Sequence, residues 1–272
     1  MTVMGAWRIA AVPLCAALVW SAEFVYTHNP HNRWRQYERE MQDPVDDPPG
    51  AWDQTEFAFA RLRYRSPRDG FFRRFARWGT DSNKSERIFM QAIRRLTRVD
   101  TRSVEEIVDV DSDEMFNWPF LYAVGVGDWV LSDSQAARLR QYFENGGFLM
   151  VDDFHNAREW ATFMAGMRRV FPDRDAVEIP DDHPIFQVSY DTRHPYHVPG
   201  YQIVYGQEWE RGGVGGHYRA IMDDKGRVMV AICFNMDLGD AWEWADAPEY
   251  PEKYSALALR LGINYLLYTM TH

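Results

Sequence analysis

Residues 118–153 form the segment WPFLYAVGVGDWVLSDSQAARLRQYFENGGFLMVDD, which predicts a strand, a helix and a second strand in succession. The run at 119–126 is almost wholly apolar, as is typical of a strand that is covered on both faces. A second short apolar run, at 148–151, ends at Asp152 and Asp153. Because a crossover of this length joins parallel neighbours with a right-handed connection, the segment predicts a parallel sheet.

The helix between these two strands has recognisable ends. Ser132 precedes Gln135 by three positions, the capping-box spacing in which each side chain binds a backbone N–H at a helix start. Asn145 and Gly146 tolerate the left-handed conformation that ends helices, so the helix is expected to stop there. Its apolar positions recur at helical spacing and are Ala136, Leu139, Tyr142 and Phe143.

Strand and helix patterns also alternate before this segment. Residues 57–64 have the pattern of a first strand, and residues 104–110 are a second strand candidate. Asp81 or Ser82 can cap a helix between them. The expected inward face of that helix carries Ile88, Phe89, Ala92, Ile93 and Leu96. This alternation predicts an α/β fold in which helices cover a sheet.

The C-terminal part of the chain is less regular. A further helix is expected at 156–170, whereas residues 180–216 show no sustained period and predict a long loop or a small inserted lobe. Residues 218–222 and 227–234 flank a turn and predict an antiparallel hairpin, and a final helix at about 254–270 should pack on the sheet. The folded domain is therefore expected to span residues 55–272.

Residues 1–27 predict a transmembrane or signal-anchor helix. No charge occurs between Ile9 and Trp20. Extension of the run to Tyr26, which includes Ser21 and Glu23, gives 18 helical residues that reach roughly 27 Å, just under a bilayer core. A cleaved secretory signal is the alternative. Residues 28–54, which are rich in proline and aspartate, are expected to form a tether. The anchor is expected to combine apolar and interfacial aromatic side chains, at Trp7, Ile9, Leu14, Leu18, Trp20, Phe24 and Tyr26.

The expected topology is a single pass through the inner membrane with the domain in the periplasm. A short N-terminal tail followed by an apolar run of signal length is how export usually begins. Arg33, Arg35 and Arg39 follow the span while Arg8 precedes it, so a count of positive charges favours a cytoplasmic domain instead. Both orientations stay open.

Charge and cysteine content exclude some functions. A formal net charge of −10 disfavours nucleic acid as the main partner, since phosphate binding needs clustered lysine and arginine. The two cysteines, Cys15 and Cys233, do not suit an intradomain disulfide, so they do not identify the compartment. One basic cluster is expected to be a solvated face, with an anion-binding patch as the alternative: Arg61, Arg63, Arg65, Arg68, Arg73, Arg74 and Arg77.

Six motifs in this order give the chain a family resemblance: FAFARLRY at 57–64, FLYAVGVGDWVLS at 120–132, FENGGFLMVDD at 143–153, DHPIF at 182–186, MDLGDAWE at 236–243 and ALRLGINYLLYTMT at 258–271. Together they resemble a bacterial domain family of unknown function within the glutamine-amidotransferase-like, flavodoxin-like superfamily. The resemblance covers about residues 56–272. It implies a three-layer fold and frequent export or membrane association, but no established activity.

In amidotransferases of that superfamily, a nucleophilic cysteine lies on the turn after a central strand. The comparable turn here carries Asp152 and Asp153, and Cys233 falls inside a predicted strand. The resemblance therefore implies a scaffold without its catalytic cysteine, and amide hydrolysis through a cysteine is not expected.

An acidic corner is the candidate ligand site. Asp128, Asp152, Asp153 and His155 should lie at the carboxyl ends of strands, where open α/β sheets bind their ligands. Carboxylate and imidazole groups are suitable metal ligands. Aspartates after a strand also cap helices and bind loop amides, so a purely structural role is the alternative and no metal or cofactor is assigned.

Tryptophan-rich loops suggest binding. The segment GDAWEWADAPEYPEKY is aromatic, acidic and loop-like, and such loops anchor protein interfaces. The expected interface comprises Trp209, Trp242, Trp244 and Tyr250, with a loop that packs over the domain's own core as the alternative.

Taken together, these features favour a membrane-anchored, non-catalytic binding domain that is an accessory or assembly subunit of a larger membrane protein complex. Its expected partners are integral membrane subunits and the bilayer, with any small-molecule ligand unknown. The alternative is a metal-assisted hydrolase or carbohydrate-active domain that uses the acidic corner.

Overall fold

A computed structural model describes residues 49–66 and 77–272, which contain a seven-stranded mixed sheet in the order β2-β1-β3-β4-β7-β6-β5. Strands β2, β1, β3, β4 and β7 run parallel, while β6 and β5 are antiparallel additions at one edge. The strands are β1 (Ala60–Arg63), β2 (Glu106–Asp109), β3 (Phe120–Val124), β4 (Phe148–Phe154), β5 (Val177–Glu178), β6 (His217–Met222) and β7 (Val228–Phe234).

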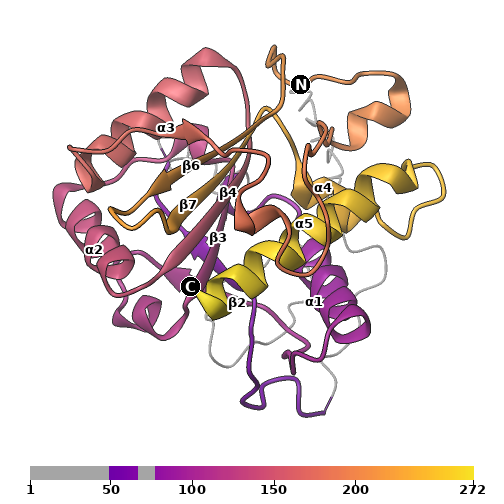
Figure 1. The fold of residues 1–272 in the computed structure, drawn as a ribbon, viewed down its shortest axis with the longest axis horizontal. Helices are drawn as coiled ribbons and strands as arrows, with labels where there is room; N and C mark the ends of the chain where they lie inside the picture. Colours follow the sequence, from indigo (N-terminus) through magenta and orange to yellow (C-terminus); the bar gives the residue numbers. More distant parts are fainter. Residues whose placement is uncertain (1–48, 67–76) are drawn as a thin grey trace, which may run out of the picture.

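Helices cover both faces of the sheet (Figure 1). The first core lies between the sheet and α1, α4 and α5, and the second lies between the sheet and α2 and α3. The helices are α1 (Lys84–Leu96), α2 (Asp133–Glu144), α3 (Asn156–Val170), α4 (Leu238–Glu243) and α5 (Glu252–Thr271). The predicted α/β fold with a mostly parallel sheet is thus confirmed.

The central strands are buried on both faces because their side chains alternate between the two cores. In β3, Phe120, Tyr122 and Val124 pack under α1, α4 and α5, whereas Leu121 and Ala123 pack under α2 and α3. All five are at most 1% exposed. A strand with two apolar faces can occupy only the middle of such a sheet, which explains its continuous apolar run.

The strand, helix and strand predicted at 118–153 are confirmed. Ser132 and Gln135 form both hydrogen bonds of the capping box at the start of α2. The helix ends at Asn145, followed by Gly146 with a φ of 99°. Strands β3 and β4 pair in parallel, with Phe120 opposite Phe148.

Elsewhere the boundaries and faces differ from the prediction. β1 is shorter than residues 57–64, because Phe57 forms only an isolated bridge with Thr101. In α1 the buried face includes Met90, whereas Leu96 is 51% exposed. β2 is shorter than residues 104–110, and β4 continues past Asp152 to Phe154.

The hairpin and the last helix match the prediction, since β6 and β7 pair antiparallel and α5 packs on the first core. Within residues 180–216 the backbone forms two 3₁₀ helices, Pro184–Phe186 and Tyr201–Tyr205. The segment expected to be a loop after β7 contains α4, which the sequence analysis missed.

The expected anchor at residues 1–27 and most of the tether lie outside the described residues. None of the helices in the described ranges combines the length and apolarity that a bilayer crossing requires.

Candidate functional site

The candidate site lies at the carboxyl ends of β4 and β7. These strands are parallel neighbours, so Asp152 and Asp153 of β4 lie beside the residues that follow β7, and the Asp153 N–H donates to Met236 O at 3.2 Å. The register shifts between Val151 and Phe154, and Asp153 has a φ of 50°. This local irregularity leaves the two aspartates in different surroundings.

Asp152 contacts the start of α4. It is completely buried, and its Oδ2 accepts hydrogen bonds from the N–H groups of Leu238 and Gly239, at 2.7 and 2.8 Å, and from the Tyr122 hydroxyl at 3.3 Å. Burial raises the pKa of Asp152 well above its ordinary value, although the amide hydrogen bonds oppose this shift. Asp152 therefore holds α4 against the sheet.

Replacing Asp152 by alanine is expected to lower the free energy of unfolding by about 2–4 kcal/mol, because two buried amides lose their acceptor. Asp152→Asn keeps an acceptor oxygen and is expected to cost less than half as much. Chemical denaturation at pH 7 measures both. Equal losses for the two variants would show that the acceptor at this position is unimportant.

Asp153 has charged partners, unlike Asp152. Its Oδ1 is 3.2 Å from His155 Nε2 and pairs with Arg211, and its Oδ2 lies 3.6 Å from Arg77 Nη2. Both guanidinium groups also donate to Asp153 O, at 2.9 and 3.0 Å. Burial alone would raise the pKa of Asp153, but Arg211, His155 and Arg77 hold it well below its ordinary range. Asp153 is therefore a buried carboxylate that stays charged.

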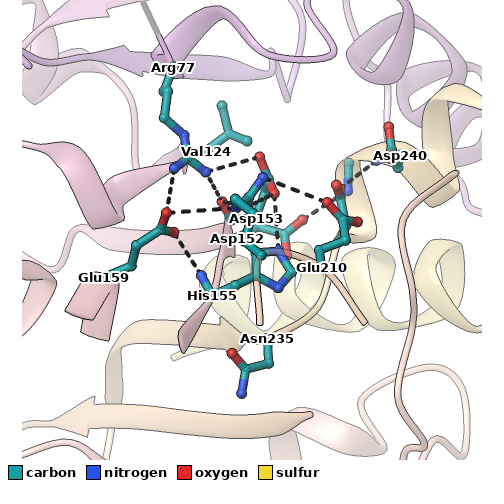
Figure 2. A network of polar contacts seen from close by, with 12 residues as sticks. Arg77, Val124, Asp152, Asp153, His155, Glu159, Glu210, Asn235 and Asp240 are labelled. Carbon is teal, nitrogen blue, oxygen red and sulfur yellow. Dashed lines mark hydrogen bonds and ion pairs between the residues drawn. The ribbon is translucent and has the colours of Figure 1, made fainter. Parts of the chain in front are cut away.

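Arg77 is the centre of this charged group (Figure 2). Its Nη1 donates to Glu159 Oε1 at 2.8 Å and lies 3.6 Å from Asp128 Oδ2. Glu159 in turn accepts the His155 N–H at 2.8 Å through its other oxygen. One guanidinium thus links the η5 turn after β3 (Val126–Asp128), the end of β4 and the first turn of α3.

The glycine-rich segment at 212–216 lies over the strand ends. Asn235, directly after β7, donates its Nδ2 to Val214 O and Gly215 O at 3.1 and 2.9 Å, and its Oδ1 accepts the Asn156 N–H at 2.9 Å. A Cβ at Gly213 would overlap Asn235 Oδ1 and lie 3.0 Å from His155 Cβ. Glycine is needed there because the segment packs directly against the site. This packing also places Glu210 and Arg211, which precede the segment, at the site.

A group of carboxyls continues from Glu210 towards α4. Asp237 Oδ1 accepts the Asp240 N–H at 2.7 Å, and Asp240 Oδ2 accepts the Tyr201 N–H at 2.6 Å. Burial, followed by the charges of Asp153 and Asp240, raises the pKa of Glu210 to about 7. Burial likewise raises the pKa of Asp240 to about 6 and that of Asp237 well above its ordinary value. The negative charges of these three acids are therefore less well balanced by nearby cations than the charge of Asp153.

Three overlapping sets of side chains within the described residues have the geometry to hold a cation. In each set the possible ligand atoms lie within 4.8 Å of one another. The sets are Asp153, His155 and Glu210; Glu210, Asp237 and Asp240; and Asp81, Asp240 and Glu243. Figure 2 shows Glu210 between the Asp153 and His155 pair and Asp240, so this residue links the first two sets.

The structure places the four predicted corner residues in three different roles. Asp153 and His155 contact each other, and Asp128 joins them only through Arg77. Asp152 belongs instead to the α4 contact. Of the four, only Asp153 and His155 are in direct contact with each other.

Sequence reasoning missed six residues of this region: Arg77, Glu159, Glu210, Arg211, Asp237 and Asp240. Asp237 and Asp240 could have been found, because they follow a predicted strand just as Asp152 and Asp153 do. Glu159 lies one helical turn after His155, at a position that favours an acid. Glu210 and Arg211 come from an aperiodic segment and carry no such signal.

Two members of the basic cluster, Arg61 and Arg77, are not on the solvated face expected from the sequence, whereas Arg65 is exposed as expected. Arg61 is completely buried and paired with Glu86, and Arg77 is almost as deeply buried in the candidate site. Arg63 pairs with Asp109. Three members, Arg68, Arg73 and Arg74, lie outside the described residues.

The expected interface residues divide into two pairs. Trp242 and Tyr250 are buried, and Trp242 stacks on Phe89 of α1, so these two side chains are not available to a partner on this surface. They fit the alternative in which the segment packs over its own core. Trp209, which stacks on His197 at 4.2 Å between ring centroids, and Trp244 remain partly exposed.

Comparison with known protein families gives a match over most of the chain. The model of a family described as "Domain of unknown function (DUF4159)" matches residues 58–270. The matched range extends from β1 to α5 and includes every residue of the candidate site. No curated protein matches the chain.

Proposed function

The chain belongs to the DUF4159 family, and we propose that its domain acts by binding, as an accessory or assembly subunit of a larger membrane protein complex. The observation that carries this proposal is a group of rings that are exposed or partly exposed, which we call the aromatic surface and define as Tyr201, Tyr205 and Trp244. Rings of this kind are enriched at the energetically dominant positions of protein interfaces.

The aromatic surface joins the segment before the glycine-rich turn to the end of α4. Tyr201 and Trp244 have ring centroids 4.2 Å apart, and Tyr205 lies edge-on to Tyr201 at 5.9 Å. Tyr205 is 74% exposed. Lys84 Nζ lies 4.6 Å from the centre of the Trp244 ring, which adds a cation to one side of this surface.

The closed strand ends also support binding over catalysis. Asp152, Asp153 and His155 are each at most 2% exposed, and Asp152 and Asp153 are engaged by amides or guanidinium groups. The turn after β4 carries neither cysteine nor serine. Cys233 is completely buried in β7, and burial raises the pKa of its thiol well above the ordinary value.

We further propose that the domain derives from the flavodoxin-like, amidotransferase-like scaffold without the catalytic cysteine. Its parallel strands lie in the order β2-β1-β3-β4-β7, which is the flavodoxin order 2-1-3-4-5 when the parallel strands alone are counted. The two antiparallel strands are then an addition beside the last parallel strand. This strand order supports the superfamily resemblance but assigns no activity.

The membrane part of the proposal comes from the sequence of residues 1–27. We propose that they form a single inner-membrane anchor and that the domain lies in the periplasm, with the cytoplasmic orientation as the alternative. Integral membrane subunits and the bilayer would then be the partners. The anchor would keep the aromatic surface near such subunits and raise their effective concentration.

The test is co-purification from detergent-solubilised membranes with a tagged full-length chain. Tyr205→Ala combined with Trp244→Ala is expected to reduce recovery of the integral membrane partner at least tenfold, because interface rings commonly contribute about 2 kcal/mol each. Leu96→Ala is the matched control, since Leu96 is an exposed apolar residue at the end of α1, outside the aromatic surface. Deletion of residues 1–27 is expected to abolish recovery.

Unchanged partner recovery with the double variant would contradict a role for the aromatic surface. Unchanged recovery after deletion of residues 1–27 would contradict the anchor. Circular dichroism of each variant separates a lost contact from a lost fold.

A metal-assisted hydrolase or carbohydrate-active domain is the second candidate function. It is favoured by the ligand atoms of Asp153, His155 and Glu210, which lie within 4.8 Å of one another at the strand ends. Under this alternative, Asp153→Asn abolishes turnover and leaves partner recovery intact, whereas the aromatic double variant has the opposite effect.

A further inference from the structure

Three buried carboxylates come together beside the start of α4 without an arginine in their midst. Asp237 is the residue before α4, Asp240 lies in its first turn, and Glu210 comes from the segment that covers the strand ends. Each is at most 9% exposed, and their possible ligand atoms lie within 4.8 Å of one another. Arg211 lies at the edge of this set: its Nη1 is 3.6 Å from Glu210 Oε2, while its Nη2 is already paired with Asp153.

Side-chain oxygens from three residues converge at Gly200. A Cβ on this glycine would overlap Glu210 Oε1 and would lie 2.7 Å from Asp240 Oδ2 and 3.1 Å from Gln202 Oε1. Any other residue at position 200 would therefore collide with these oxygens. Glycine lets the three side chains bring their oxygens together against the backbone at this point.

Two of these oxygens have no donor in good hydrogen-bond geometry, although the Gly200 N–H lies near enough to the Glu210 carboxyl to oppose the rise of its pKa. Glu210 Oε1 and Gln202 Oε1 are both buried from solvent and accept no hydrogen bond with normal geometry. A buried acceptor without a partner costs roughly 1–3 kcal/mol, and a bound ion or water is one way in which such a group is satisfied. Glu210 as a whole is only 8% exposed, and it is directed towards Asp240.

We propose that Glu210, Asp237 and Asp240, with the Gln202 amide oxygen, bind a divalent cation of the Ca²⁺ or Mg²⁺ class. The donors are all oxygens, as these hard cations require, and a carboxylate set combined with an amide oxygen is typical of Ca²⁺ sites. Zn²⁺ would favour nitrogen or sulfur ligands, which this set does not offer.

The cation would tie the segment that carries Tyr201 and Tyr205 to the start of α4. Tyr201 already donates its N–H to Asp240, and Gln202 follows it directly. The site would therefore order one half of the aromatic surface. Cation binding is separable from the proposed function, because it is measured on the isolated chain while partner recovery is measured in membranes.

The experiment is calorimetric titration of the chelator-treated full-length chain with CaCl₂ and, separately, with MgCl₂ at pH 7.5, with the thermal midpoint measured in parallel. We expect one bound cation per chain and a rise of several degrees in the midpoint for at least one of the two salts. Glu210→Gln and Asp240→Asn are each expected to weaken binding at least tenfold. Glu208→Gln is the matched control, since Glu208 is an exposed acid in the same segment.

Failure of the wild-type chain to bind either cation would overturn the proposal. Protonation of the carboxyls, and not a metal ion, would then offset their mutual repulsion. Equal affinity in Glu210→Gln and in the wild type would overturn it as well. Asp240→Asn provides an independent variant if Glu210→Gln does not fold, and the wild-type titration is decisive without either.

Discussion

Replacing Arg77 by methionine is expected to lower the free energy of unfolding by about 3–5 kcal/mol at pH 7, because it removes the most deeply buried cation that three buried carboxylates share. Arg77 faces Glu159 at 2.8 Å and Asp128 and Asp153 at 3.6 Å. Methionine retains most of the buried apolar stem but none of the charge. The loss should therefore be mainly electrostatic.

Arg158→Met is the matched control for Arg77. Arg158 lies 3.8 Å from Asp128 and 3.9 Å from Glu159, but its side chain is 67% exposed, so the control should cost less than about 1 kcal/mol. Urea denaturation measures both variants. Equal small losses would show that Arg77 does not hold the strand ends together.

The effect of Arg77→Met should also depend on pH. The pKa of Asp153 is lower in the folded chain than in the unfolded chain. Its ionised form therefore stabilises the fold at a pH above the unfolded pKa, and this contribution is lost as the pH falls through the folded pKa. In the variant, the buried carboxylates are expected to become protonated at a higher pH than in the wild type, because Arg77 no longer stabilises their charged forms. The difference between the two proteins should shrink from pH 7 towards pH 4.

Replacing Arg61 by methionine is expected to cost a similar 3–5 kcal/mol. Arg61 is completely buried, pairs with Glu86 and donates to Trp78 O and Thr80 O at 2.9 and 2.8 Å. The substitution leaves a buried carboxylate and two carbonyls without their donor. These contacts fix the segment that leads from Arg77 into α1, so its loss should also loosen the candidate site.

Arg140→Met is the control for Arg61. Arg140 pairs with Glu144 at 3.0 Å on the exposed face of α2, and such helical pairs contribute about 0.3–0.5 kcal/mol. Combining Arg61→Met with Glu86→Leu should recover part of the loss, because no buried charge is left unpaired. Denaturation at pH 7 measures all three, and a loss below 1 kcal/mol for Arg61→Met would contradict the importance of this pair.

The fold could be predicted from the sequence where capping residues and apolar runs coincide with the helix ends and buried strands of the structure. Ser132 and Gln135 fix the start of α2 through bonds three residues apart, and Gly146 supplies the left-handed residue at its end. The apolar runs of β3 and β4 reflect burial on both faces. α4 was missed although Asp237 is a local N-cap for it, because the helix has only six residues and its start also depends on Asp152, which lies 86 residues from Leu238 in the chain.

The candidate site was only partly predictable for the same reason. The strand-end rule locates Asp152, Asp153 and His155, but it does not say which face each side chain takes. The shift of register after Val151 separates the two aspartates, and no sequence pattern announces it. Glu210 and Arg211 reach the site through turns at glycines, where neither helical nor strand period applies.

Two of the tryptophans expected at an interface differ in burial. Trp242 falls inside α4 and packs among Phe59, Phe89 and Tyr122, whereas Trp244, two residues later, is the C-cap of the same helix and lies on Tyr201. Two residues correspond to about 200° of helical rotation, so neighbouring tryptophans take opposite roles. The composition of the segment alone could not separate them.

The most direct test of the proposed binding role is the mass of the tagged full-length chain after purification from solubilised membranes, measured by light scattering in detergent. We predict a stable complex with an integral membrane protein for the wild-type chain, and its dissociation when Tyr205 and Trp244 are both replaced by alanine. A wild-type chain that is recovered alone, with no membrane protein attached, would contradict the proposal.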